Sequence, residues 1–553
     1  MIDQKKAEEE KKAEEVKKAE EAKKAEEAKK AEEARKAAAA EAAKKAAAAE
    51  KAAAAEDLKK IGEHYYNLFA AGGEVAPEVL AILKNRNPAE KFAQLRASQH
   101  PQAQFLWAIF RDVFHYCACQ LGAIADNARD VDFAMRWGFG WQQGPFETWQ
   151  AAGWQTIANA IKADIEAGVA MTNAPLPAWV FDGRTGVHTP DGSWSATDAA
   201  LKPRSTLPVY QRQLFPERVL GEAAPDAGVT LWENEGVRLW NLPAKDARIG
   251  IISFKSKMHA VGDEVLDGVL EAIARAERDL DGLVIWHEAP FAVGANLAQV
   301  VEACKAGQFD RLEKTVAKFQ QASMALKHSA VPTVAAVQGM ALGGGCEFVM
   351  HATHRVLALE SYVGLVEAGV GLIPAGGGCK EFALRAAGLA SRAAGGDVFP
   401  FIQNMFQTIA MANVSKSALQ AVELGFAKES DDILFNANEL LHVALARARA
   451  IAESGYQPPL IQRAVQVAGR NGIATCEMML INMKEGGFIS AWDYRVARAA
   501  ATALCGGEVE TNAKVSEQWI LDVERALFVD LLKTEKTQQR IVHMLETGKP
   551  LRN

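Results

Sequence analysis

The chain has 553 residues, 49% of them hydrophobic, and a formal net charge of −7, which gives no general attraction to nucleic acid or anionic lipid. This length exceeds what one hydrophobic core supports, so two or more domains are expected. The seven cysteines lack the spacing of a zinc site or a disulfide framework, and no apolar run reaches about 18 residues, so we expect a cytoplasmic protein without metal, disulfides or membrane insertion.

Residues 1–56 are a low-complexity segment of Ala, Glu, Lys and Arg, which are strong helix formers. Pairs such as Glu14 and Lys18 stand at i,i+4 in the stabilising orientation. The alanine stripe of the six-residue repeat drifts around a helix, so it provides no seam for a coiled coil. We predict a long charged N-terminal helix that serves as a spacer or comes from a fusion, and that carries no chemistry.

Residues 57–177 have the composition of an all-α domain, with apolar residues at helical spacing in the stretch 105–114. The stretch 130–149, DVDFAMRWGFGWQQGPFETW, resembles the all-α C-terminal domain of 3-hydroxyacyl-CoA dehydrogenases. The resemblance implies a dehydrogenase-type helical domain that packs, dimerises or shapes an acyl site. The alternative is a helical domain whose aromatic residues and glycines serve packing alone.

The rest of the dehydrogenase pattern is missing from the sequence. A strand followed by the Gly-x-Gly-x-x-Gly turn that holds the NAD pyrophosphate is not found, nor is an HFFNP-like segment with a catalytic histidine. His64 and His115 lie in helical context and are expected to be structural. We therefore expect no NAD cofactor and no dehydrogenase activity.

Residues 178–247 are rich in turn residues and short apolar runs. Asp191-Gly192 and Asn234-Glu235-Gly236 predict hairpins, the second between the strands 229–232 and 237–240. We interpret this stretch as a connector with a structural role.

Residues 248–428 alternate between strand and helix patterns, which predicts an α/β core of βα units. Strands are predicted at 249–254, 283–286, 331–337 and 355–359, and a helix at 264–279. The strand 331–337 is followed by a break at Gly339 and by three glycines, 343–345, which leave bare amides where a helix can begin. Glu347 follows at once and Glu367 twenty residues later, so two acids and free amide donors could form a proton-transferring site with an oxyanion hole.

Three motifs in this segment are informative in combination, although each one alone is a weak signal. A lone run of glycines is often only a turn, and a lone glutamate is usually a surface residue. Together, ALGGGCE, GLVEAGVGLIPAGGG and the upstream FAVGAN resemble the crotonase (enoyl-CoA hydratase/isomerase) superfamily. The resemblance implies a ClpP/crotonase-like spiral core with Glu347 and Glu367 as catalytic residues and the backbone N–H groups of Ala295 and Gly344 as the oxyanion hole.

The same resemblance implies where the substrate lies. The family usually has Asp at the position of Asn296, which bears on substrate detail more than on the reaction. The segment 255–260 stands where the family's loop runs along coenzyme A, so Lys255 and Lys257 could meet its phosphates, although surface lysines are common at strand ends. The residues expected to bind the substrate are Lys257, Ala260, Gly294, Asn296 and Gly343.

Residues 429–553 are predicted to be helical, and in crotonases such C-terminal helices close the site and build the oligomer. The end of the chain resembles that of bacterial bifunctional proteins of fatty-acid β-oxidation in which the dehydrogenase precedes the hydratase. That resemblance runs from about residue 85 to residue 553, so the chain resembles the C-terminal part of such a protein without its NAD-binding domain.

The preferred hypothesis is an enoyl-CoA hydratase of fatty-acid β-oxidation that acts on an acyl-CoA thioester, with no metal and no separate cofactor, as a homo-oligomer. One alternative is a Δ3,Δ2-enoyl-CoA isomerase, which needs only the carboxylate at the position of Glu367. A second is a weakly active scaffold subunit that binds a thiolase.

Overall fold

The computed structural model describes residues 74–553, so the predicted helix at 1–56 and the first part of the 57–177 segment lie outside the described residues. The chain divides into two compact units. Unit 1 extends to Arg204 and includes Arg218–Ala223, whereas unit 2 contains Ser205–Glu217 and Ala224–Asn553. Among residues 74–553, no helix is both long and apolar enough to cross a bilayer.

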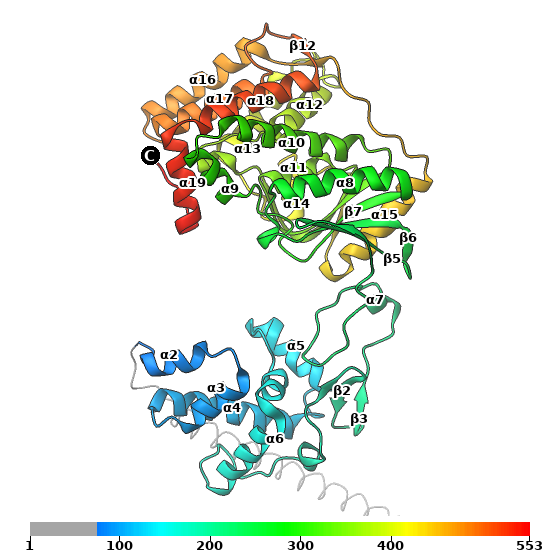
Figure 1. Ribbon diagram of the computed structural model, residues 1–553, viewed down its shortest axis with the longest axis vertical. Coiled ribbons are helices and arrows are strands. Elements are labelled where there is room, and N and C mark those ends of the chain that lie inside the picture. Colours follow the sequence, from blue (N-terminus) through cyan, green and yellow to red (C-terminus); the bar gives the residue numbers. More distant parts are fainter. Residues whose placement is uncertain (1–73) are drawn as a thin grey trace, which may run out of the picture. The chain divides into compact units, whose positions relative to one another are not determined.

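Unit 1 is a helical bundle with a small three-stranded antiparallel sheet (Figure 1). Four of its helices begin with proline, whose fixed φ and missing N–H suit the first turn. The stacked indoles of Trp149 and Trp154, 4.1 Å apart, lie in its core. Its elements are α2 (Pro77–Lys84), α3 (Pro88–Ala97), α4 (Pro101–Gln120), α5 (Ala128–Phe139), α6 (Pro145–Glu166), η1 (Ala178–Phe181), β1 (His188–Thr189), β2 (Gly192–Ser195) and β3 (Ala200–Lys202).

The motif at 130–149 joins α5 to α6. The carboxylate of Asp132 accepts the N–H groups of Phe146 and Glu147, at 2.8 and 2.9 Å, and so caps the N-terminus of α6. Its Oδ2 also lies 2.7 Å from Nε2 of His188. A Cβ at Gly144 would stand 2.3 Å from Asp132, so the close approach requires glycine. The motif residues therefore have a packing role here.

Unit 2 is built on a seven-stranded sheet in the order β10-β9-β8-β7-β6-β5-β4. The strands from β6 to β10 are parallel, and β4 and β5 extend the sheet as antiparallel strands. The strands are β4 (Val229–Glu233), β5 (Val237–Leu242), β6 (Asp246–Phe254), β7 (Gly282–Ile285), β8 (Thr333–Leu342), β9 (His354–Gly364) and β10 (Asp432–Leu434).

Helices cover both faces of this sheet, and Figure 1 shows α8 and α10 lying across one of them. Their apolar faces join the main core, whereas α15 packs on the opposite face in a second core. The helices of unit 2 up to α15, on both faces of the sheet and in its loops, are α7 (Pro208–Gln211), η2 (Lys257–His259), α8 (Asp263–Asp279), α9 (Leu297–Lys305), α10 (Phe309–His328), α11 (Gly344–His351), η3 (Glu367–Val370), α12 (Gly378–Ala390), α13 (Phe399–Ala410), α14 (Ala418–Glu423), η4 (Ala437–Glu439) and α15 (Leu440–Glu453).

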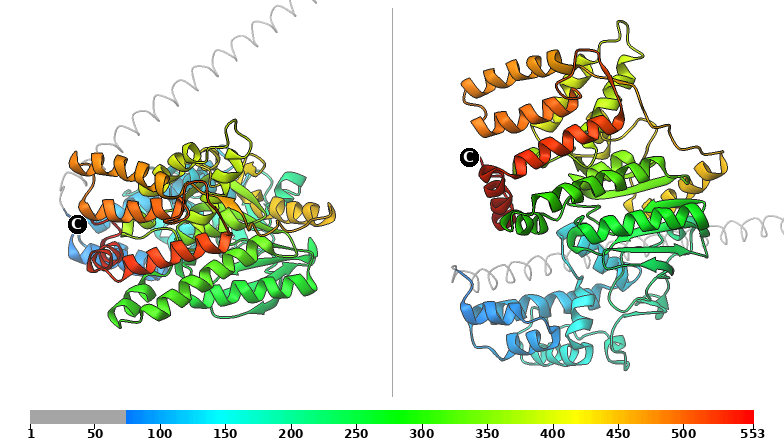
Figure 2. Two further views of the ribbon diagram at one scale, coloured as in Figure 1. Left: turned by 90° about the horizontal axis from the view of Figure 1, so that it is seen from above. Right: turned by 45° about the horizontal axis from the view of Figure 1, so that its top comes forward.

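The C-terminal helices α16, α17 and α18 run side by side, as both views of Figure 2 show. The helix α18 also packs on α10 and α12, which places C-terminal residues next to the core of the sheet. The last elements are β11 (Val465–Gln466), α16 (Gly469–Glu485), α17 (Ala491–Leu504), β12 (Lys514–Val515), α18 (Glu517–Leu532) and α19 (Glu535–Thr547).

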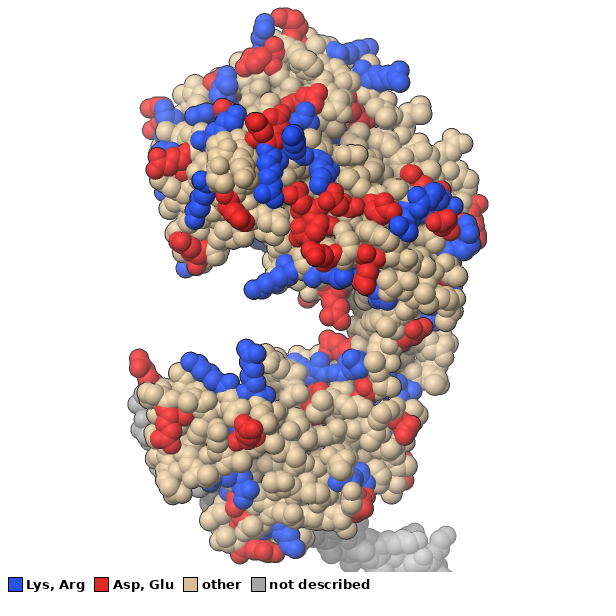
Figure 3. Space-filling view, in the orientation of Figure 1, with Lys and Arg blue, Asp and Glu red and all other residues tan. Residues whose placement is uncertain are grey.

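Charges of both signs are interspersed over α8, α10 and α18 on the face of unit 2 shown in Figure 3. Several form exposed pairs, such as Lys318 with Asp267 at 2.8 Å. Pairs of this kind contribute little to stability.

The structure confirms the predicted strands and both hairpins but extends several of the strands. The predicted break at Gly339 is wrong, because β8 continues to Leu342. Gly339 has φ +63°, and the pairing with β9 shifts register between Val337 and Gly339, so the strand bends there without ending. β9 likewise runs on to Gly364.

The segment 178–247 does not form a separate body. Strands β1–β3 belong to unit 1, and β4 and β5 belong to the main sheet of unit 2. Residues after 428 are not only helical either, since β10 is the edge strand of the same sheet. The sequence pattern could not show this, because pairing partners distant in the chain decide which sheet a short strand joins.

Candidate active site

Two glycines turn the end of β8 into the first turn of α11. Gly343 has φ +52° and ψ −122°, a conformation that L side chains rarely adopt. A Cβ at Gly344 would lie 2.4 Å from the ring of Phe319, so this residue must also be small. Gly344 is the first residue of α11, where the N–H groups have no partner within the helix. The turn thus presents bare amides to the interior of unit 2.

A second amide comes from the loop after β7. Val261 donates to the carbonyl of Gly294 at 2.8 Å and accepts from the N–H of Asn296 at 3.0 Å. Because successive N–H groups alternate along an extended segment, the N–H of Ala295 faces away from Val261. Gly294 lies close to the amide of Gly344, which would be 3.5 Å from a Cβ built at Gly294. Ala295 and Gly344 therefore lie on neighbouring segments that line one cavity, and the oxyanion hole expected from their amides stays a prediction.

The side chain of Asn296 caps the N-terminus of α9. Its Oδ1 accepts the N–H of Gln299 at 3.3 Å. Asn and Asp are about equally good at this position of a helix. The replacement of the family's usual Asp by Asn296 therefore preserves the cap.

Glu347 lies in the first turn of α11 and is 2% exposed. Its Oε1 accepts the N–H groups of Gly376 and Gly378, both at 2.8 Å. Burial raises the pKa of Glu347 to about 7, against the lowering effect of these two bonds. A Cβ at Gly376 would lie 2.4 Å from Glu347 Oε2, so the backbone can approach the carboxyl only as glycine.

Glu367 opens η3 on the opposite side of the glycine turn, where its Oε1 would lie 3.1 Å from a Cβ at Gly343. Its Oε2 is buried and has no hydrogen-bond partner among residues 74–553. Burial first, and then the charge of Glu347, raise the pKa of Glu367 well above its ordinary value. Burial therefore makes both carboxyls less ready to lose a proton than an exposed glutamate.

Both acids face one cavity of about 460 Å³. Most of its wall is apolar, and the C-terminal part of the chain closes it with Phe528, Met544 and Pro550. Seven of the nine residues predicted for the site line this cavity: Gly294, Ala295, Asn296, Gly343, Gly344, Glu347 and Glu367. The other two, Lys257 and Ala260, lie outside the lining in and after η2, and their contact with a substrate stays a prediction.

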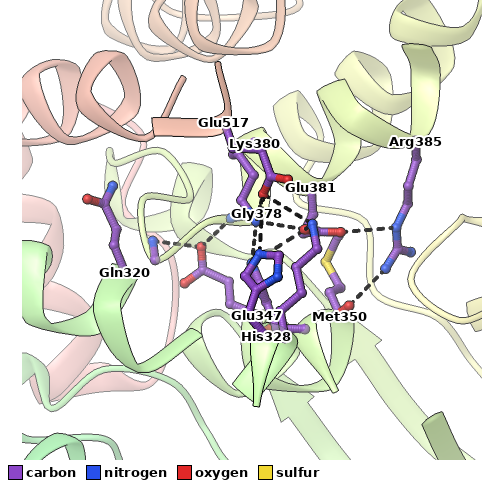
Figure 4. Close-up of polar contacts among 12 residues, drawn as sticks. Gln320, His328, Glu347, Met350, Gly378, Lys380, Glu381, Arg385 and Glu517 are labelled. Atoms are coloured by element: carbon purple, nitrogen blue, oxygen red, sulfur yellow. Dashed lines mark hydrogen bonds and ion pairs between the residues drawn. The ribbon is translucent and has the colours of Figure 1, made fainter. Parts of the chain in front are cut away.

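A buried charge network lies behind Glu347 (Figure 4). His351 Nδ1 lies 2.6 Å from the carbonyl of Glu347, and its Nε2 lies 2.8 Å from Lys380 Nζ. Because an ammonium only donates, Nε2 accepts and Nδ1 carries the proton. The Lys380 ammonium also donates to Glu381 at 2.6 Å and lies 3.7 Å from Glu517. This network fixes the backbone that carries Glu347.

The sequence analysis did not predict this network, nor the hydrogen bonds from the amides of Gly376 and Gly378 to Glu347. The run of three glycines at 376–378 was available as a pattern, since a helix that starts after glycines offers free N–H groups to an anion. Four histidines of unit 2, His259, His328, His351 and His354, each bind a backbone carbonyl or an aspartate.

Among residues 74–553, no group of three or more His, Cys, Asp or Glu side chains is arranged to hold a metal ion. The expectation that the reaction needs no separate cofactor stays a prediction.

Comparison with known proteins places these observations in a family context. Residues 245–394, which contain Glu347 and Glu367, match the enoyl-CoA hydratase/isomerase family. The "Probable 3-hydroxyacyl-CoA dehydrogenase" of Bacillus subtilis is 33% identical over 485 residues, which are 86% of this chain and 58% of that protein. The "Fatty acid oxidation complex subunit alpha" of Idiomarina loihiensis is 28% identical over 293 residues, which are 52% of this chain and 37% of that protein.

A solved structure of a carnitinyl-CoA dehydratase from Mycobacterium thermoresistibile covers 57% of this chain and 91% of its own, with 16% identity and a TM-score of 0.41. The chain spans less than two thirds of the length of the two relatives named above. The crotonase relationship predicted for the segment around Glu347 is confirmed by the family match: residues 245–394 are similar to enoyl-CoA hydratases and isomerases.

Proposed function

We propose that the chain is an enoyl-CoA hydratase that adds water to a trans-2-enoyl-CoA to give the 3-hydroxyacyl-CoA. The N–H groups of Ala295 and Gly344 hold the thioester oxygen and stabilise the negative charge that it gains as water attacks. Glu347 removes a proton from the water, whose oxygen bonds to C3. Glu367 delivers a proton to C2, so protons and electrons balance over the step.

The observation that supports this assignment is the presence of two buried carboxyls, Glu347 and Glu367, in one cavity with the glycine turn at Gly343 and Gly344. With a pKa of about 7, Glu347 is substantially ionised at neutral pH and can act as a base. Burial and the charge of Glu347 raise the pKa of Glu367 well above the ordinary value, which suits this group to act as an acid. Neighbouring carboxyls whose pKa values are shifted by their environments are typical of an acid and base pair. After each turnover, the proton that Glu347 gained returns to Glu367 through solvent.

The acyl-CoA substrate and the setting in fatty-acid oxidation rest on the family match and on the names of the relatives. The apolar wall of the cavity suits an acyl chain. Association with further copies of the chain, and with a thiolase, belongs to the same proposal. Size-exclusion chromatography of the purified chain, alone and with a purified thiolase, tests it.

The test is the loss of enone absorbance from crotonyl-CoA, with and without NAD. We expect hydration that NAD does not change, with no NADH formed. Glu347→Gln and Glu367→Gln should each lower kcat by about 10²–10⁴-fold. Near-normal rates in both variants would refute the assignment. Conversion of a 3-enoyl-CoA by a protein that fails to hydrate crotonyl-CoA would instead identify an isomerase, and thioester binding without turnover would identify a scaffold.

A further inference from the structure

A third carboxyl is buried behind the two acids of the cavity. Glu524, on α18, has no exposed surface. Its Oε2 accepts the backbone N–H of Lys380 at 3.0 Å, and its Oε1 accepts the amide of Gln320 at 3.2 Å. Both donors are neutral, and none of the ion pairs seen within residues 74–553 includes Glu524. A carboxyl buried without a cation needs an explanation.

Gln320 is held so that it can only donate to this carboxyl. Its Oε1 accepts from Arg525 at 2.6 Å, and its Nε2 donates to the carbonyl of Leu521 at 2.8 Å as well as to Glu524. The amide therefore cannot turn its oxygen toward Glu524 without losing both bonds. The site is built to receive an acceptor at this position.

Glu524 and Glu347 share one helix end. α12 begins at Gly378, whose N–H binds Glu347, and the N–H of Lys380 in the same turn binds Glu524. The N-terminus of a helix offers roughly half a positive charge. It can therefore stabilise one carboxylate but cannot neutralise two, so the ionisation of either acid opposes that of the other.

The neighbouring cations are already balanced (Figure 4). The ammonium groups of Lys327 and Lys380 both donate to Glu381 at 2.6 Å, and Lys327 donates to Glu517 at 3.2 Å. Two buried cations thus face two buried carboxylates. Glu524 lies outside this balance.

We propose that Glu524 is a positioning residue of the site, which shares the first turn of α12 with Glu347, so that its ionisation opposes that of the acids of the cavity. The inference rests on the proposed function. In support, burial and the charge of Glu347 raise the pKa of Glu524 to about 8, and Glu524 contributes to the raised pKa of Glu367. The other titratable groups that face it are Cys379 and Lys380 on α12, and its own helix supplies Arg525 through Gln320.

The test is the pH profile of kcat for crotonyl-CoA hydration by the full chain. Glu524→Gln keeps the shape but removes the charge, so Glu367 should lose its proton at lower pH. We expect the alkaline limb to move down by about one pH unit. Glu524→Asp should restore the limb toward that of the wild type. Asp530→Asn removes a carboxylate from the exposed side of α18 and should leave the limb in place.

A second measurement needs no turnover. Since the pKa of Glu524 is raised above its ordinary 4.5 to about 8, the stability that its neutral form contributes is lost as pH rises through this window. The Tm of Glu524→Gln, relative to that of the wild type, should therefore increase from pH 5 to pH 8. The Tm of Asp530→Asn should run parallel to that of the wild type.

The outcomes separate this inference from the proposed function. If the wild type hydrates crotonyl-CoA and Glu347→Gln does not, but the limbs of the wild type and Glu524→Gln coincide, the inference is overturned and the function stands. A rate lowered equally at every pH, without a moved limb, also overturns it, because that is a structural effect. If the wild type does not hydrate the substrate, the proposed function fails, and a Tm difference that stays constant with pH then overturns the role of Glu524.

Discussion

Replacing Glu347 by glutamine should remove activity and yet stabilise the fold at high pH. In the folded protein the pKa of Glu347 is about 7, against an ordinary 4.5, because burial penalises the charged form. Since the folded pKa is raised, the neutral carboxyl favours folding below pH 4.5, and this contribution is lost as pH rises through 7. The shift corresponds to about 3 kcal/mol in full, of which about 2–3 kcal/mol falls between pH 5 and pH 8. Glutamine has the same shape and never ionises.

The assay is urea unfolding of unit 2 in the full chain at pH 5 and at pH 8. The free energy of unfolding of Glu347→Gln, minus that of the wild type, should be larger at pH 8 by about 2–3 kcal/mol. Glu429→Gln, at an exposed glutamate, is the matched control and should show no such change. An equal difference at both pH values would show that Glu347 is ionised as easily in the folded as in the unfolded chain. The assignment of this residue as a base poised near neutral pH would then fail.

Four further predictions concern the same structure. The kcat for hydration should fall about tenfold per pH unit below pH 7, as Glu347 gains a proton, and a rate that is constant from pH 5 to pH 8 would contradict this. Gly376→Ala should lower kcat about 100-fold and also lower Tm, because its Cβ would lie 2.4 Å from the Glu347 carboxyl and 2.5 Å from the buried ring of Phe319. Lys380→Met should cost about 3–5 kcal/mol in urea unfolding, since it leaves two buried glutamates with one ammonium. Asp132→Asn should destabilise unit 1 by about 2 kcal/mol, seen in its unfolding transition, while the rate of hydration stays unchanged.

The cavity could be predicted where its residues lie in short motifs. The glycines at 343–345 directly precede Glu347, so one local pattern specifies both the turn and the acid that follows it. FAVGAN follows a buried strand, which is enough to expect a loop at the end of the sheet. The resemblance to crotonases then joined these pieces, and the structure places Ala295, Gly344, Glu347 and Glu367 around one cavity.

Other parts of the site could not be predicted because they depend on packing between distant segments. Glu524 lies 144 residues after Lys380, whose N–H it accepts, and 204 residues after Gln320. In the sequence it is one glutamate in an amphipathic helix and reads as a surface residue. Only the packing of α18 on α10 and α12 shows that it is buried. The assignment of β4 and β5 to the main sheet has the same origin.

The helical motif in unit 1 is held together by hydrogen bonds among its own residues. Asp132 caps α6, and Gly144 leaves room for Asp132 because it has no side chain. The carboxylate of Glu147 accepts the N–H groups of Gly144 and Leu220 at 2.9 and 2.8 Å. These polar groups satisfy one another inside unit 1. A motif whose members are bonded in this way specifies how two helices meet, and it would persist in any protein that keeps that junction. In unit 2, Glu367 has a buried oxygen without a partner among residues 74–553 and also faces a cavity, and this combination is what makes it a candidate for chemistry.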